Sequence, residues 1–129
     1  MKKNNNIRLF LDDERFPVDC KNYAYNFGID CSIYDEKWAI VRNYKDFTGF
    51  IEIFGIPKVI SFDHDIADYD DNGKERTGTD CANWLIEYCL DNGVKPPEYY
   101  VHSANNVGRE YISGKIENLK KFQKKYLDL

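Results

Sequence analysis

Residues 7–15 read Ile-Arg-Leu-Phe-Leu-Asp-Asp-Glu-Arg, an apolar run that ends abruptly in acidic side chains. Short apolar runs bounded by polar residues are typical of strands buried inside a sheet. Two later runs follow the same pattern: Val59–Phe62 leads into Asp63-His64-Asp65, and Tyr99–Val101 leads into His102-Ser103. The carboxyl ends of parallel strands share one edge of an open α/β sheet, and ligands bind there. We therefore expect these polar groups to meet at one site.

The segments between these runs carry helical patterns. Trp38–Val41 is a further strand candidate, and Asn43 is suited to cap a helix that ends at Gly55. The apolar residues of this helix recur at helical spacing: Tyr44, Phe47, Ile51 and Phe54. A second helix is expected to start at Thr79 or Asp80 and to stop before Gly93.

The last helix is expected to start near Asn105 or Asn106. Its apolar stripe should face the core through Ile112, Ile116, Leu119, Phe122 and Tyr126. Residues 16–36 show no clean period, so we expect an irregular excursion with a short helix or hairpin. Residues 66–78 are polar and form a loop long enough to act as a lid or substrate loop.

Strands that alternate with helices predict right-handed crossovers and a mostly parallel sheet. The expected fold class is α/β, with three layers, about four strands, and no regular fifth strand after the last helix. With 129 residues, the chain is expected to form a single domain over residues 1–129.

Charge and composition limit the classes of function. A formal net charge of -4 argues against an extended nucleic-acid surface, although a nucleotide or an RNA terminus needs only a few arginines. No apolar run is long enough to span a membrane, and Met1-Lys2-Lys3 leads into asparagines rather than a signal sequence. The four cysteines have no zinc-like spacing: Cys20, Cys31, Cys81 and Cys89. These features favour a cytoplasmic protein without a membrane partner, and they leave the oligomeric state open.

Asp12, Asp13 and Asp63 are the candidate metal ligands. Carboxylates that converge in one crevice repel each other, so their arrangement requires a divalent cation or shifted pKa values. Oxygen ligands of this kind suit a hard cation, Mg²⁺ or Mn²⁺. The alternative is that Asp-Asp-Glu-Arg is only a solvated turn after a strand.

The chain has two histidines, His64 and His102, and each follows a predicted strand. As an acid–base pair they could act on a phosphoester, with Asp63 as the third catalytic candidate: one takes a proton from water and the other protonates the leaving oxygen. The alternatives for His64 are a metal-ligand role and a structural role in which it bonds to its acidic neighbours.

Four residues are candidates for binding phosphate: Arg15, Ser103, Asn105 and Arg109. Ser103 can donate to a phosphoryl oxygen, and Asn105 opens a helix whose first N–H groups favour anions. Gly108 would let an anion approach the backbone closely. Arg15 and also Arg42 can clamp phosphate, or can instead pair with the acidic cluster.

Together these residues resemble the cyclic-phosphate-processing receiver-like domains, which occur in bacteria and phages. The resemblance covers residues 7 to 113, through the segments Leu-Phe-Leu-Asp-Asp-Glu-Arg-Phe-Pro, Trp-x-x-Val-Arg-Asn-Tyr, Ile-Ser-Phe-Asp-His-Asp, Gly-Thr-Asp-Cys-Ala-x-Trp-Leu and Val-His-Ser-Ala-Asn-x-Val-Gly-Arg-Glu. It implies the flavodoxin-like fold of response-regulator receivers. In that fold Asp12 and Asp13 resemble the metal-binding pair, Asp63 the phosphoacceptor, and Ser103 the small hydroxyl residue after the fourth strand.

Two departures from an ordinary receiver point to a reworked phosphate site. Ordinary receivers have a lysine after a fifth strand, which is missing here, and they lack histidines at the positions of His64 and His102. The resemblance implies a role on cyclic phosphate ends in RNA repair or conflict systems, in the host cytoplasm if a phage encodes the protein.

The expected function is a metal-assisted phosphoesterase, or cyclic phosphate hydrolase, that acts on a nucleotide or RNA-end phosphate. One alternative is a non-catalytic, degenerate receiver that binds a nucleotide signal or a protein partner. The other is a true receiver in which Asp63 accepts a phosphoryl group.

Overall fold

The computed structural model describes residues 5–21 and 31–129, and its centre is a parallel sheet of four strands. These strands are β1 (Arg8–Leu11), β2 (Ala39–Val41), β3 (Val59–Phe62) and β6 (Glu98–Val101), in the spatial order β2-β1-β3-β6. Every neighbouring pair is parallel. The predicted α/β class and receiver-like sheet are confirmed, and the sheet has no fifth strand within the described residues.

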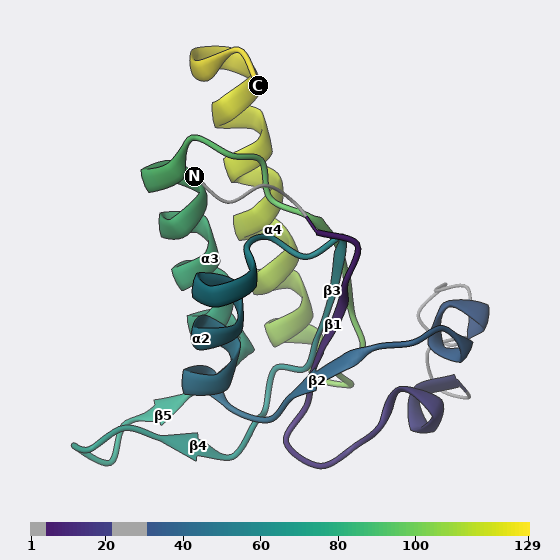
Figure 1. The fold of residues 1–129 in the computed structure, drawn as a ribbon. Helices are drawn as coiled ribbons and strands as arrows, with labels where there is room; N and C mark the ends of the chain where they lie inside the picture. The colour runs from purple at the N-terminus through teal and green to yellow at the C-terminus, as the bar shows by residue number, and fades with distance from the viewer. Residues whose placement is uncertain (1–4, 22–30) are drawn as a thin grey trace.

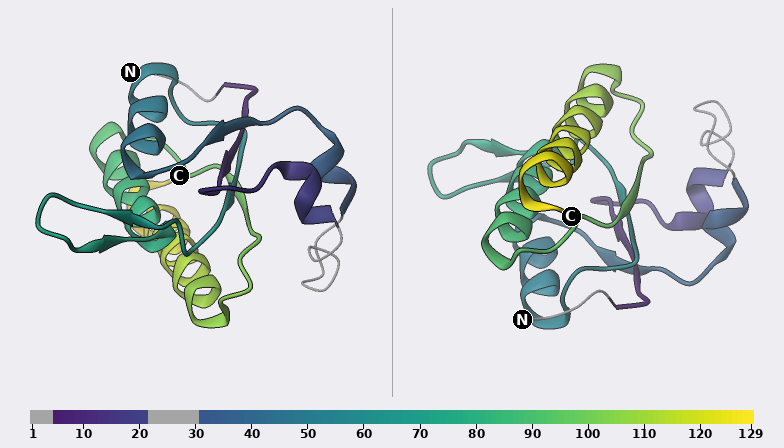
Figure 2. Two further views of the ribbon diagram at one scale, coloured as in Figure 1. Left: turned by 90° about the horizontal axis from the view of Figure 1, so that it is seen from below. Right: turned by 90° about the horizontal axis from the view of Figure 1, so that it is seen from above.

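One face of the sheet is covered by the three long helices, α2 (Tyr44–Phe54), α3 (Gly78–Asn92) and α4 (Asn106–Phe122) (Figures 1 and 2). Strand side chains alternate between the two faces, so every second residue enters this helical layer. The strand residues in this main core are Leu9, Leu11, Val41, Ile60, Phe62 and Val101.

The other face carries a thinner layer made of two 3₁₀ helices, η1 (Pro17–Cys20) and η3 (Cys31–Asp35) (Figure 1). A second, smaller core lies beneath them, formed by Phe10, Cys20 and Tyr34 with Ile33, Trp38 and Ile40 around it. The predicted excursion at residues 16–36 is therefore irregular where the structure describes it. Residues 22–30 of that prediction lie outside the described residues.

Helix starts follow short polar capping patterns. Asn43 caps α2 as predicted, because its side chain accepts a hydrogen bond from the Asp46 N–H. The prediction that Thr79 or Asp80 starts α3 was wrong by two or three residues: the cap is Thr77, which forms a reciprocal capping box with Asp80. Asn105 caps α4 through the Gly108 N–H.

The expected apolar stripes extend too far at two helix ends. Phe122 and Tyr126 are 45% and 64% exposed, so the prediction that they face the core was wrong, and Phe54, which shares the helical spacing of α2, is 53% exposed. The last turns of α4 and the π-helical segment η4 (Gln123–Leu127) extend past the end of the sheet, where no strand lies beneath them (Figure 1).

Residues 66–78 are not a simple loop, since they contain the antiparallel hairpin β4 (Asp68–Tyr69) and β5 (Glu75–Arg76). The hairpin projects from the body of the molecule beside the helices (Figures 1 and 2). Across the described part of the chain, no helix combines the length and the apolar character needed to cross a membrane.

Candidate active site at the carboxyl edge of the sheet

Asp12, Asp63 and His102 meet at the carboxyl edge of the sheet because of the strand register. Leu11 pairs with Phe62, and Phe62 pairs with Val101, so the residues that follow these three are also neighbours. One potential ligand atom from each of the three side chains lies within 4.8 Å of the other two. The prediction that three distant stretches bring polar groups to one place is confirmed for these residues, and together they could hold a metal ion.

A hollow of about 180 Å³ opens above this cluster, and we call it the acidic hollow. Five carboxylates and one guanidinium line it, so its charge is strongly negative. Its lining residues are Asp12, Asp13, Glu14, Arg15, Asp63, Asp65, Ser103, Ala104 and Asn105. An anionic phosphate entering the acidic hollow would be repelled unless positive charge accompanied it.

Asp12 is 1% exposed and is held by three hydrogen bonds. Its Oδ1 accepts from the backbone N–H groups of Glu14 (3.0 Å) and Arg15 (2.9 Å), and its Oδ2 lies 3.1 Å from His102 Nε2. Burial by itself raises the pKa of Asp12, but these hydrogen bonds outweigh it and lower the pKa to about 2. Asp12 is therefore a carboxylate at neutral pH.

Asp63 has the opposite electrostatic environment. Burial and the neighbouring Asp12 carboxylate raise the pKa of Asp63 to about 7, although Arg15 and a hydrogen bond from the His64 N–H oppose the change. Burial also raises the pKa of Asp13, with Asp12 and Glu14 adding to the effect. A cation in the acidic hollow would relieve this repulsion among the carboxylates.

His102 lies beneath the acidic hollow with no exposed surface. Its ring stacks on Phe10 at a centroid distance of 4.5 Å, and its Nδ1 is 2.7 Å from Ser61 Oγ. Burial lowers the pKa of His102, although the hydrogen bond and charge of Asp12 oppose this. Both ring nitrogens thus have protein partners, and the ring does not line the acidic hollow.

His64 is the more accessible imidazole, with a side chain 17% exposed, but like His102 it is not among the residues that line the acidic hollow. Its Nδ1 is 2.9 Å from Asp65 Oδ1 and 3.3 Å from Asn105 Nδ2. A carboxylate can only accept, so the shorter contact places the proton on Nδ1. In the neutral ring Nε2 then keeps its lone pair, as a general base requires.

Gly108 is close to His64 rather than to an open anion site. A Cβ on Gly108 would overlap Cγ of the His64 ring and lie 2.8 Å from its Cβ. The close approach expected at this glycine is therefore made by the imidazole ring, which packs against the first turn of α4.

Gly108→Ala is expected to displace the His64 ring and to destabilise the protein by about 1–3 kcal/mol, the usual cost of overpacking. Long-range ¹H–¹⁵N spectra of the His64 ring and thermal unfolding would measure both effects. Gly114→Ala in the same helix is the matched control, because no atom of another described segment lies within 4 Å of its added Cβ. If both variants gave wild-type His64 signals, the packing argument would be wrong.

The predicted phosphate-binding residues divide between two places. Arg15, Ser103 and Asn105 line the acidic hollow, whereas Arg109 lines a separate groove between β6 and α4 with Tyr99 and Tyr100. The Ser103 hydroxyl oxygen accepts a hydrogen bond from the Asn105 N–H. Of the four residues that the sequence suggested for phosphate binding, three therefore lie together at the acidic hollow.

Arg42 supports the acidic turn from outside the acidic hollow. Its Nη1 donates to the backbone carbonyls of Asp12 (3.1 Å) and Arg15 (2.6 Å), and its guanidinium lies over the Phe16 ring. These contacts stabilise the turn at residues 12–15. Arg42 therefore has a structural role here, rather than the role of phosphate clamp that was considered from the sequence.

Sequence reasoning missed Ser61 and Tyr34. Both are buried, and Tyr34 Oη lies 2.8 Å from Ser61 Oγ, directly next to the His102 contact. Ser61 had a detectable signal, because it is the one polar residue inside the apolar strand Val59–Phe62. Tyr34 had none, since it lies in the irregular segment.

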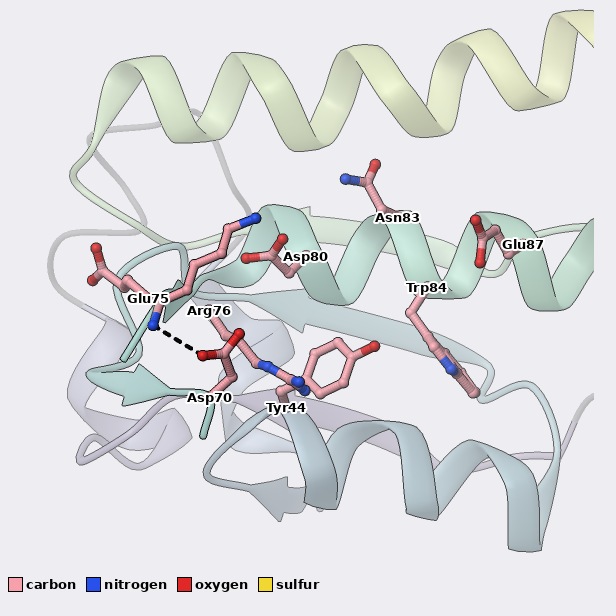
Figure 3. A pocket seen from close by; sticks show the side chains of 9 residues that line it. Tyr44, Asp70, Glu75, Arg76, Asp80, Asn83, Trp84 and Glu87 are labelled. Carbon is pink, nitrogen blue, oxygen red and sulfur yellow. Dashed lines mark hydrogen bonds between the residues drawn. The ribbon is translucent and has the colours of Figure 1, made fainter. Parts of the chain in front are cut away.

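A second hollow, of about 290 Å³, lies between the β4–β5 hairpin and helices α2 and α3 (Figure 3). Arg76 lies over the Tyr44 ring at 4.2 Å, and Asp68 accepts from the Tyr44 N–H, so the hairpin is attached to the start of α2. This hollow contains none of the predicted site residues. None of residues 66–78 lines the acidic hollow, so the segment expected from the sequence to act as a lid or substrate loop does not border this site.

The parallel strand order β2-β1-β3-β6, with acidic residues at the carboxyl edge, is that of a receiver-like α/β domain. Comparison with protein families agrees: the model of the cyclic-phosphate processing receiver domain matches residues 7–118. The chain belongs to this family, which confirms the resemblance drawn from the sequence. Comparisons with curated proteins and with solved structures give no match.

Proposed function

We propose that this domain is a metal-assisted phosphoesterase that acts on a terminal phosphate of a nucleotide or an RNA, with cyclic phosphates as the expected substrates. The observation that carries the proposal is the meeting of Asp12 and Asp63 at the acidic hollow. Two buried carboxylates side by side are unfavourable in a purely structural role, and the pKa of Asp63 is raised accordingly.

The donor set fits a hard divalent cation, Mg²⁺ or Mn²⁺. Asp12, Asp63 and Asp13 would hold it, and carboxylate oxygens are the ligands such ions prefer. A bound cation would supply the positive charge that lets phosphate oxygens enter and would help to orient a water. Arg15, Ser103 and Asn105 would contact the phosphoryl oxygens from the other lining positions.

His64 is our candidate for proton transfer. Asp65 holds its Nδ1–H, so Nε2 would take a proton from the attacking water. The water oxygen bonds to phosphorus, one ester P–O bond breaks, and His64 returns the proton to the leaving oxygen. This scheme replaces the acid–base pair expected from the sequence, because buried His102 has no surface through which to exchange a proton with a substrate.

Asp12→Asn is expected to reduce cation-dependent turnover at least 100-fold, because it removes a carboxylate ligand. The first step is a mass-spectrometric screen of purified protein against linear and cyclic nucleotides and RNA ends, with and without Mg²⁺ or Mn²⁺. The variant is then assayed on the substrate found, with exposed Asp91→Asn as the charge-matched control. Equal turnover by Asp12→Asn and wild type would refute the metal assignment.

A non-catalytic binding module is a second candidate, favoured by the burial of His102 and because neither imidazole is among the residues that line the acidic hollow. Tight cation-dependent binding of a cyclic nucleotide that is recovered unchanged would support it. Labelling by acetyl phosphate that disappears in Asp63→Asn would instead indicate a true phosphoacceptor receiver.

A further inference from the structure

A chain of four buried polar side chains runs along the face of the sheet that the 3₁₀ layer covers, from Tyr34 to the acidic hollow. Tyr34 Oη lies 2.8 Å from Ser61 Oγ, Ser61 Oγ lies 2.7 Å from His102 Nδ1, and His102 Nε2 lies 3.1 Å from Asp12 Oδ2. All four residues are at most 2% exposed. Buried polar groups are costly unless they are satisfied, and here each one has a partner within the chain.

The direction of the hydrogen bonds follows from the Asp12 end. Asp12 Oδ1 accepts from two backbone N–H groups and Oδ2 lies 3.1 Å from His102 Nε2, so the carboxylate is the acceptor and His102 Nε2–H is the donor. In a neutral imidazole the other nitrogen, Nδ1, is then an acceptor, and Ser61 must donate to it. The Ser61 oxygen is left to accept from the Tyr34 hydroxyl. The chain therefore runs Tyr34 to Ser61 to His102 to Asp12.

We propose that Tyr34, Ser61 and His102 act as positioning residues: a buried hydrogen-bond relay that fixes the orientation of the Asp12 carboxylate for cation binding. The relay fixes Asp12 Oδ2, while the backbone N–H groups of Glu14 and Arg15 fix Oδ1. The carboxylate is thus held from two directions. This inference rests on the proposed cation site, but it does not depend on which substrate is used or on turnover.

The relay also assigns a role to the irregular layer on the second face of the sheet. Tyr34 comes from η3, and its ring lies edge-on to both Phe10 and His102. Phe10 in turn stacks flat against the imidazole at an interplanar angle of 3°. Aromatic packing therefore fixes the plane of the His102 ring, and the hydrogen bonds fix which nitrogen carries the proton.

Two competing roles for His102 make different predictions. As a metal ligand, its Nε2 would have to present a lone pair, and Nδ1 would carry the proton. As a proton-exchanging catalyst, its replacement would abolish turnover and leave cation binding intact. A positioning role predicts protonated Nε2, and it predicts that cation affinity responds to groups that never touch the cation.

The first experiment measures the tautomer and needs no metal. Long-range ¹H–¹⁵N correlation spectra of the wild-type protein in EDTA should show His102 protonated at Nε2 and bare at Nδ1. In Ser61→Ala the ring should stay protonated at Nε2, which Asp12 fixes, but the ¹⁵N chemical shift of Nδ1 should change because Nδ1 loses its hydrogen-bond donor. A wild-type ring with bare Nε2, or a Ser61→Ala spectrum identical to wild type, would overturn the relay.

The second experiment measures Mg²⁺ and Mn²⁺ affinity by titration calorimetry with the metal ion alone. Partners that orient metal ligands change affinity roughly 10- to 100-fold when lost. We expect a loss in this range for His102→Leu, smaller losses of at least about 3-fold for Ser61→Ala and Tyr34→Phe, and near-wild-type affinity for His102→Gln, whose amide can still donate to Asp12. Tyr99→Phe is the control, because its hydroxyl bonds to Glu117, away from the acidic hollow.

The outcomes separate the relay from the proposed function. If the wild type bound the cation but turned over no substrate, and the variants lost cation affinity as expected, the phosphoesterase proposal would be rejected and the relay would be supported. If affinity were unchanged in folded Ser61→Ala and Tyr34→Phe, the relay would be rejected whether or not the protein is an enzyme. If the wild type bound neither cation, the proposed site and its relay would both be rejected.

Discussion

Replacing Asp63 by Asn is expected to stabilise the metal-free protein at pH 8, even though Asp63 is a candidate cation ligand. Burial and the Asp12 carboxylate raise the pKa of Asp63 from 3.8 to about 7, so its charged form is disfavoured in the folded state. At roughly 1.4 kcal/mol per pKa unit, this amounts to about 4 kcal/mol. Because the coupled Asp12 charge shares the effect, we expect a gain of about 2–4 kcal/mol in the free energy of unfolding.

The pH dependence of this gain follows from the raised pKa. The protonated group favours folding, and its contribution is fully present below pH 3.8 and lost as pH rises through about 7. The advantage of Asp63→Asn over wild type should therefore be largest at pH 8, smaller at pH 5 and close to zero near pH 4.

Thermal unfolding in EDTA measures the stability that Asp63→Asn gains without a cation. Thermal unfolding in excess Mg²⁺ measures the stabilisation by the cation that the variant loses. The wild-type midpoint should rise with Mg²⁺, whereas that of Asp63→Asn should not respond, because a ligand that binds only the folded state stabilises it. Asp71→Asn, exposed in the β4–β5 turn, removes the same formal charge and is the control. Equal midpoints for Asp63→Asn, Asp71→Asn and wild type in EDTA would refute the predicted repulsion.

Gly78→Ala is expected to destabilise the protein by about 2–4 kcal/mol and to lower its unfolding midpoint by about 10 °C. A Cβ at Gly78 would overlap the backbone carbonyl oxygen of Asp63 and lie 3.0 Å from His64 Cα. Backbone atoms at a strand end cannot rotate away as a side chain can. The first turn of α3 would have to move, which would break the 2.7 Å hydrogen bond from the Gly78 N–H to the His64 carbonyl.

The matched control is Gly49→Ala, because Gly49 is also helical and, among the residues that the structure describes, none outside its own turn comes within 4 Å of its added Cβ. Alanine there should stabilise α2 by up to about 1 kcal/mol. The two substitutions add the same methyl group and should shift the midpoint in opposite directions. A Gly78→Ala midpoint equal to wild type would show that α3 does not press on the end of β3.

The sequence predicted the parts of the site that depend on strand periodicity. Leu11 and Phe62 end apolar runs, and a parallel register makes the residues after them neighbours, so the meeting of Asp12 with Asp63 needed no three-dimensional information. The helix caps Asn43 and Asn105 were also readable, because each is a local pattern of a few residues.

The remaining differences arise from contacts between distant segments. No local pattern shows that His102 would be covered by Tyr34 or that Gly108 would receive the His64 ring. The prediction that Phe122 is buried was wrong for a related reason. Helical periodicity indicates which face of a helix is apolar, but not where the sheet beneath that face ends.

The register of the sheet restricts how the chain length can vary in relatives that keep this chemistry. Adding or deleting one residue within β1 would turn Asp12 toward the opposite face of the sheet, because side-chain direction reverses at each step. The same holds for β3 and β6. Insertions and deletions should therefore collect in the 3₁₀ segment, in the β4–β5 hairpin and beyond α4. The number of residues between each strand and the polar residue that follows it, Asp12, Asp63 or His102, should stay constant.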